Sequence, residues 1–259
     1  MVYLHNKNVL FFKAQKIAGT SFEIALSSYA DDPHHDIITR ISPIDEVLRM
    51  KLGYALPRNW STDKKVEQRY IEAIEKLSRI TDDPSQPLNN NQKRLEKECR
   101  ALFRRSNGKI YSNHMLPAEV ARHMDKRQFD RAFKISIVRD PYEMLVSRAF
   151  WKLRDAADYS KHFAAMVNQL IAEGETNFDY YVDEDGKDTC DFYIRYENLE
   201  RDLRKIDDRL GTDLWDLMPN TKHKSRKDRR PARQLLSEEQ MLTYYETNKM
   251  EFERFGYAP

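Results

Sequence analysis

Glycine, cysteine and long apolar runs are all scarce in this sequence of 259 residues, which contains 7 glycines and 2 cysteines. Cys99 and Cys190 are too few for a disulfide framework or a cysteine-based metal cluster. No apolar run approaches the length of about 20 residues that spans a bilayer, and the opening MVYLHNKNVLFF is typical of neither a secretory signal nor a transit peptide. We therefore expect a reducing, cytoplasmic location, no membrane span and no bound metal.

An excess of charge of one sign is also absent. With 44 Lys and Arg against 42 Asp and Glu, the net charge is only +2, so any basic site must be local. A hydrophobic share of 40% is enough for a core, and the length suits one α/β domain or one domain with an insertion.

Short apolar runs alternate with amphipathic helical patterns, which predicts an α/β fold whose mainly parallel sheet is flanked by helices. Helices are expected from about residue 20 to 29, from Pro141 behind an Asp140 N-cap, and from Ser237, which stands in capping-box spacing to Gln240. We expect strands at residues 9–14, 109–113, 132–138 and 190–195.

Residues from about 43 to 106 differ in character from the rest. They contain two charged amphipathic stretches, STDKKVEQRYIEAIEKLSRI and NNNQKRLEKECRALFRRS, joined by a polar linker. This pattern predicts a helical insertion within a single domain that spans residues 1–259, rather than a second core.

The stretch QKIAGTS places a small, hydroxyl-rich, cationic turn between the first expected strand and helix. Ligands of parallel sheets bind at the carboxyl ends of strands, and a helix N-terminus there favours anions. Ala18 and Gly19 allow close backbone approach to a phosphate, while Thr20 and Ser21 offer hydroxyl donors and Lys16 a charge. The stretch is therefore either a phosphate cradle or an ordinary helix cap with a solvated lysine. The phosphate loop of nucleotide triphosphatases needs Lys after a second Gly, whereas here Lys16 precedes a single Gly19, so a kinase is disfavoured.

A second constellation lies in VRDPYEMLVS. Arg139 ends the strongest expected strand, and Ser147 lies six residues beyond Pro141, roughly 9 Å along the helix. A guanidinium and a hydroxyl together suit a phosphate. The alternative is that Arg139 pairs with a nearby carboxylate and Ser147 is an ordinary helix-surface residue.

Together, QKIAGTS and VRDPYEMLVS resemble the cofactor motifs of the sulfotransferases that use 3′-phosphoadenosine 5′-phosphosulfate (PAPS). The variant FFKAQKIAGTSF is most similar to the carbohydrate, Golgi-type branch, which includes the heparan 2-O- and 6-O-sulfotransferases. The resemblance covers most of the chain, with residues 43–106 the least matched, and implies a P-loop-like sulfotransferase fold with PAPS as co-substrate and no metal. It assigns Arg139 and Ser147 to the 3′-phosphate, and to the 5′-phosphosulfate it assigns Lys16, Ile17, Ala18, Gly19, Thr20 and Ser21.

The same resemblance implies a catalytic base in KIYSNHMLP. In the uronyl 2-O-sulfotransferase relatives a His after such a strand is the base, and His114 takes that position, although the companion His of those relatives is Ser112 here. A His suits this task because its ordinary pKa, about 6.5, lies near the operating pH. His114 is alternatively a capping or core residue, and the other candidate bases are Glu23, His34, His35 and Glu119.

The third basic feature is KHKSRKDRRPAR, residues 222–233. In the resembled family a C-terminal basic loop folds over the adenosine 3′,5′-bisphosphate, which makes candidates of Lys222, Lys224, Arg226 and Lys227. The remaining cations, Arg229, Arg230 and Arg233, are candidates for attracting an anionic acceptor. Without the resemblance, this stretch is typical of a solvated or nucleic-acid-binding patch.

The expected activity is therefore transfer of a sulfuryl group from PAPS to a hydroxyl or amine of a carbohydrate or glycolipid. In this hypothesis His114 removes the acceptor proton, Lys16 stabilises the departing phosphate oxygen, and the insertion shapes the acceptor cleft. Two alternatives stay open: a small-molecule or nucleotide kinase, which requires Mg²⁺, and a non-catalytic nucleic-acid-binding module, whose binding weakens steeply with salt. We expect no nucleic-acid partner.

Overall fold

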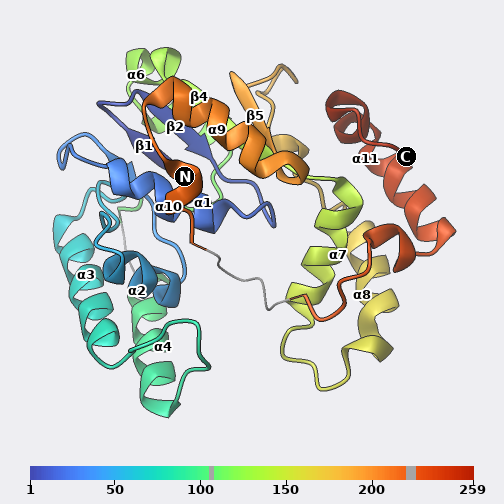
Figure 1. The fold of residues 1–259 in the computed structure, drawn as a ribbon, viewed down its shortest axis with the longest axis horizontal. Helices are drawn as coiled ribbons and strands as arrows, with labels where there is room; N and C mark the ends of the chain where they lie inside the picture. The colour runs from blue at the N-terminus through green and yellow to red at the C-terminus, as the bar shows by residue number, and fades with distance from the viewer. Residues whose placement is uncertain (105–107, 220–225) are drawn as a thin grey trace.

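The centre of the fold is a five-stranded sheet, seen in a computed structural model that describes residues 1–104, 108–219 and 226–259 (Figure 1). Its strand order is β3-β1-β2-β4-β5, with β2 parallel to β4 and β4 parallel to β5, whereas β1 is antiparallel to both β2 and β3. Four of the five strands thus share one direction, which confirms an α/β fold with a mainly parallel sheet. The bounds are β1 Val2–Leu4, β2 Val9–Phe12, β3 Ile37–Ile38, β4 Phe133–Val138 and β5 Phe192–Arg195.

The expected strand at residues 109–113 is wrong. In the described part of the chain this segment makes an isolated bridge from Lys109 to Ser61 and backbone bonds from Ile110 and Tyr111 to the Trp60 carbonyl, but it belongs to no strand of the sheet. Both edges of β2 are already paired, one with β1 and the other with β4, so the segment cannot pair with β2. The strands β1 and β3 were not predicted, because three and two residues are too short to establish a period.

The helices that border the strand ends agree with their predicted starts. Helix α1 spans Gly19–Leu26 and continues as the 3₁₀ helix η1, Ser27–Tyr29. Helix α7, Pro141–Lys152, begins behind Asp140, whose carboxylate accepts the N–H groups of two first-turn residues. Helix α11, Glu238–Phe255, has the capping box of Ser237 and Gln240. The remaining helices are α5 Pro117–His123, α6 Lys126–Arg131, α8 Tyr159–Ala172, η2 Phe178–Tyr180, η3 Tyr196–Asn198, α9 Leu199–Leu210, α10 Leu214–Leu217 and η4 Ala232–Gln234.

The stretch expected to be a helical insertion contains α2 Pro43–Lys51, α3 Lys64–Arg79 and α4 Asn90–Arg104, which gather on one side of the molecule (Figure 1). Alternate strand residues face opposite sides of a sheet. Accordingly, Phe12 packs in an apolar cluster with Trp60 and Tyr70, whereas Phe11 packs in another with Phe22 of α1 and residues of α9 and α10. The helices α2–α4 therefore share a core with one face of the sheet.

A third apolar cluster joins α7, α8 and α11 on the other side of the molecule (Figure 1). Its buried members include Tyr142, Phe150, Tyr244 and Phe252. This cluster fixes α7 at the end of β4, where the two predicted motifs meet. Among the helices of the described residues, none has both the length and the apolar character required to cross a membrane.

Candidate functional site

A cavity of about 800 Å³ opens where β2 and β4 end. Its wall is built from the loop that follows β2, the start of α1, one side of α7, the segment at residues 113–114 and residues 218–219. Every residue predicted from the first two motifs and from the base assignment lies in this wall: Lys16, Ile17, Ala18, Gly19, Thr20, Ser21, His114, Arg139 and Ser147. Segments more than 100 residues apart in the chain thus meet at one site.

The loop after β2 has an unusual backbone. Lys16 and Ala18 adopt the left-handed conformation, with φ angles of 61° and 62°. For residues with a Cβ atom this conformation costs about 1–2 kcal/mol, so the surrounding structure must hold it. Left-handed residues also occur in anion-binding nests, in which successive backbone N–H groups face one side. Ala18 then forms the N-cap of α1, and its carbonyl oxygen accepts the Ser21 N–H at 3.1 Å.

Gly19 allows a cationic side chain to pass beneath the loop. A Cβ atom at this position would lie 2.7 Å from Cγ of Lys13, closer than atoms pack. The Lys13 side chain is buried, and its Nζ lies 2.6 Å from Oε2 of Glu23. Glu23 also contacts the Met1 amino group. Burial alone would raise the pKa of Glu23, but the two ammonium groups lower it to about 2. Glu23 is therefore an ionised partner of Lys13, which disfavours it as a base.

Arg139 connects the two motifs. Its Nη1 donates to the Lys16 carbonyl oxygen at 3.0 Å, and Nη2 lies 3.4 Å from Oε2 of Glu143. The guanidinium carbon lies 4.2 Å from the ring centre of Tyr196. Within the described residues the buried Nε has no acceptor. Arg139 thus has the nearby carboxylate that the alternative interpretation expected, and it also lines the cavity.

One side of α7 supplies further wall residues. Ser147 and Trp151 stand four residues apart and line the cavity together, with Lys152 beside them. The Nζ of Lys16 lies 5.8 Å from the centre of the Trp151 ring. Next to Ser147, the buried Arg148 forms an ion pair with Glu175, and both also line the cavity.

His114 is held by a backbone contact to the opposite loop. Its Nδ1 lies 3.0 Å from the Lys13 carbonyl oxygen, so Nδ1 carries the hydrogen and Nε2 is left as an acceptor. The loss of hydration around the imidazole lowers the pKa of His114 most, and the positive charge of Lys13 lowers it further, to about 3. The residue itself remains open to the cavity. At neutral pH it presents an uncharged imidazole to any ligand there, but a pKa this low also makes it a weaker base than the ordinary value of about 6.5 expected from the sequence.

The structure places the other candidate bases outside the wall of the cavity. Among the described residues that line the cavity, none is Glu23, His34, His35 or Glu119. His34 and His35 lie in the loop between η1 and β3, and Glu119 caps α5 by accepting the Leu116 N–H at 2.8 Å. Of the five candidates, His114 alone lines the cavity.

The basic segment reaches the site only indirectly. Arg226 contacts the Glu143 carboxylate, which also accepts the Ala232 N–H at 2.7 Å. Burial would raise the pKa of Glu143, but the bonds from Arg226 and Ala232 lower it overall. Lys227 instead donates to the Ala156 carbonyl at 3.3 Å. Among the described residues that line the cavity, neither Arg226 nor Lys227 occurs. Lys222 and Lys224 lie outside the residues that the structure describes.

Sequence reasoning missed several wall residues. Lys13 and Arg148 directly adjoin the predicted motifs, so their positions were a usable signal, whereas Asn113, Tyr196 and Trp215 reach the cavity only through tertiary packing. The described wall carries a single carboxylate, that of Glu175, against five Lys and Arg side chains: Lys13, Lys16, Arg139, Arg148 and Lys152. This balance favours an anionic ligand.

No protein-family model matches this chain, and comparisons with curated proteins and with solved structures give no match either.

Proposed function

We propose that the chain is a PAPS-dependent sulfotransferase with a P-loop-like sulfotransferase fold. The observation that carries this proposal is the meeting of Lys16, Arg139 and Ser147 in one cationic cavity at the carboxyl ends of β2 and β4. Two motifs that are 123 residues apart are joined there by the bond from Arg139 to the Lys16 carbonyl. The motifs meet because β2 and β4 are neighbouring parallel strands, and the carboxyl ends of such strands are where ligands of parallel sheets bind.

The wall residues fit a nucleotide that carries two phosphate groups. The loop of residues 16–21 and the N-terminus of α1 offer backbone and hydroxyl donors for the 5′ group. The guanidinium of Arg139 and the hydroxyl of Ser147 suit the 3′-phosphate. Flat aromatic side chains of Trp151, Tyr196 and Trp215 lie in the same wall and suit an adenine or sugar ring.

PAPS supplies an activated sulfuryl group. In the proposed reaction the acceptor oxygen or nitrogen forms the new bond to sulfur while the sulfur–oxygen bond to the 5′-phosphate breaks. Nε2 of His114 takes the acceptor proton, because Nδ1 is engaged with the Lys13 carbonyl. Lys16 and the loop amides stabilise the charge that grows on the departing phosphate oxygen. The acceptor class we propose is a carbohydrate or glycolipid that enters beside His114.

Thermal melts test the proposal. The protein is heated with adenosine 3′,5′-bisphosphate, with ATP and Mg²⁺, and with no ligand. A ligand at 100 times its dissociation constant adds about 2.7 kcal/mol to the free energy of unfolding, which gives a clear rise in melting temperature. We expect a rise with the bisphosphate only. A rise with ATP and Mg²⁺ alone would favour a kinase, and no rise with either would remove the nucleotide site.

A further inference from the structure

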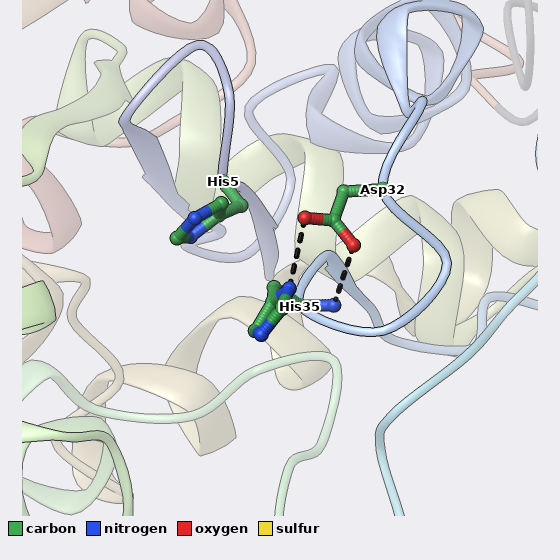
Figure 2. A group of neighbouring side chains, drawn as sticks. All are labelled: His5, Asp32 and His35. Atoms are coloured by element: carbon green, nitrogen blue, oxygen red, sulfur yellow. Dashed lines mark hydrogen bonds and ion pairs between the residues drawn. The ribbon is translucent and has the colours of Figure 1, made fainter.

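Three potential metal ligands lie together at an edge of the sheet, away from the cavity: His5, Asp32 and His35 (Figure 2). Each offers one ligand atom, and these atoms all lie within 4.8 Å of one another. Among the described residues that line the cavity, none of the three occurs. No bound metal was expected from the sequence.

The sheet register brings the two histidines together. Strands β1 and β3 are antiparallel, with Tyr3 opposite Ile37, so continuing the register by two residues places His5 opposite His35. The carboxylate of Asp36, which is fully buried, fixes the two backbones because it accepts the N–H of His5 at 2.8 Å and that of Asp32 at 2.9 Å. The positions of the three residues are thus set by the sheet and by a buried clamp.

Two of the three potential ligands already contact each other through a hydrogen bond. Nδ1 of His35 lies 2.8 Å from Oδ2 of Asp32, and a dashed line marks this contact in Figure 2. Ligands at about 2.0–2.2 Å from a tetrahedral metal ion are separated by roughly 3.4 Å. Binding an ion would therefore move Asp32 and His35 slightly apart, and it would bring together by about 1 Å any pair of ligand atoms that is 4.8 Å apart. The other oxygen, Oδ1 of Asp32, accepts the N–H groups of His34 and His35, which orients the carboxylate.

The ring of His5 completes the group. Its centre lies 4.8 Å from that of His35, with 30° between the planes. Nδ1 of His5 lies 3.4 Å from the Tyr3 hydroxyl, which leaves Nε2 for another partner. A hydrogen bond at the second nitrogen is the usual way in which a metal-binding imidazole is oriented.

We propose that His5, Asp32 and His35 form a binding site for a divalent transition-metal ion of the zinc class, with water in the remaining positions. Two imidazoles and one carboxylate suit zinc, whereas Mg²⁺ and Ca²⁺ prefer oxygen ligands alone. The ion would link the end of β1 to the loop before β3 and so stabilise this sheet edge. The site is independent of the proposed transferase activity.

The test is a calorimetric titration of Zn²⁺ into protein without an affinity tag, followed by the same titration of the variants His5→Ala, His35→Ala and His34→Ala. His34 is the matched control, since it is an exposed histidine of the same loop outside the group. We expect one saturable site, at least about tenfold weaker in His5→Ala and in His35→Ala, and unchanged in His34→Ala and in millimolar Mg²⁺. Circular dichroism confirms that each variant is folded.

Three outcomes would overturn the proposal: no saturable binding of Zn²⁺, binding that survives His5→Ala at full strength, or equal weakening in His34→Ala. A spectroscopic readout is available as well. Co²⁺ bound with four ligands in a tetrahedron gives strong visible absorption, which we expect to be lost in His5→Ala but not in His34→Ala.

Discussion

The guanidinium of Arg139 donates a hydrogen bond of 3.0 Å to the carbonyl oxygen of Lys16, and this bond joins two loops at the ends of neighbouring parallel strands. Lys16 has a left-handed backbone, so Arg139 is one of the groups that hold a strained residue in place. The two phosphate subsites of the proposed donor site are therefore coupled: a change at Arg139 is expected to affect the 5′ loop as well as the 3′ side.

Replacing Lys16 by alanine tests its role in the proposed reaction. Because the ammonium is expected to stabilise charge on the departing oxygen, Lys16→Ala should lower turnover by about 10²–10³ and weaken binding of adenosine 3′,5′-bisphosphate only a few-fold. Turnover is measured as release of the bisphosphate from PAPS. Lys76→Ala, an exposed lysine of α3, is the control. Undiminished turnover in Lys16→Ala would exclude Lys16 from the chemistry.

The low pKa of His114 leads to a prediction about pH. A general base acts in its unprotonated form, and with a pKa of about 3 His114 stays unprotonated throughout the neutral and mildly acidic range. If His114 is the base, kcat/KM should therefore stay constant from pH 8 to about pH 5. With a base histidine of ordinary pKa, about 6.5, kcat/KM would be more than tenfold lower at pH 5 than at pH 8. A profile of bisphosphate release against pH decides between the two.

His114→Gln supplies the matching variant. It should lower the rate by about 10²–10⁴ while leaving the affinity for adenosine 3′,5′-bisphosphate within a few-fold of the unmodified protein. Full activity in His114→Gln would show that another group acts as the base.

A pair of loop substitutions tests the packing beneath the 5′ loop. Gly19→Ala should lower the free energy of unfolding by about 1–3 kcal/mol, because the new Cβ would displace Lys13 from its ion pair with Glu23. Ala18→Gly should change it by at most about 1 kcal/mol, on the stabilising side, because glycine adopts the left-handed conformation freely. Chemical denaturation measures both, and an equal effect of the two would contradict this account of the loop.

The basic segment offers two neighbouring cations with different surroundings. Arg226 contacts Glu143, which in turn lies beside Arg139, whereas Lys227 contacts the Ala156 carbonyl. Arg226→Ala should therefore weaken bisphosphate binding by about tenfold, and Lys227→Ala should leave it unchanged. Binding isotherms of the two variants provide the comparison. A loss that is equal in both would point to a general charge effect.

Local signals in the sequence were enough for the elements that position the site. The apolar run before Arg139 predicted β4, and the N-cap Asp140 with Pro141 predicted the start of α7. The short strands β1 and β3 have no such signal, because they are defined by pairing rather than by a period.

The tertiary contacts of the site were beyond local reasoning. His114 was expected to follow a strand, yet it reaches the cavity because the Lys13 carbonyl binds its ring from another part of the chain. The pairing of Lys13 with Glu23 likewise depends on how the loop crosses the start of α1. Such contacts depend on sheet register and helix packing, and the sequence of one segment alone does not determine either.

The cavity is expected to bind adenosine 3′,5′-bisphosphate through Arg139, and isothermal titration calorimetry measures this binding without the need for an acceptor. We expect one site per chain, a loss of at least tenfold in affinity in Arg139→Ala, and no change in Arg100→Ala, which removes an exposed arginine that pairs with Glu96 on α4. Absence of binding to the unmodified protein, or equal affinity in Arg139→Ala, would contradict it.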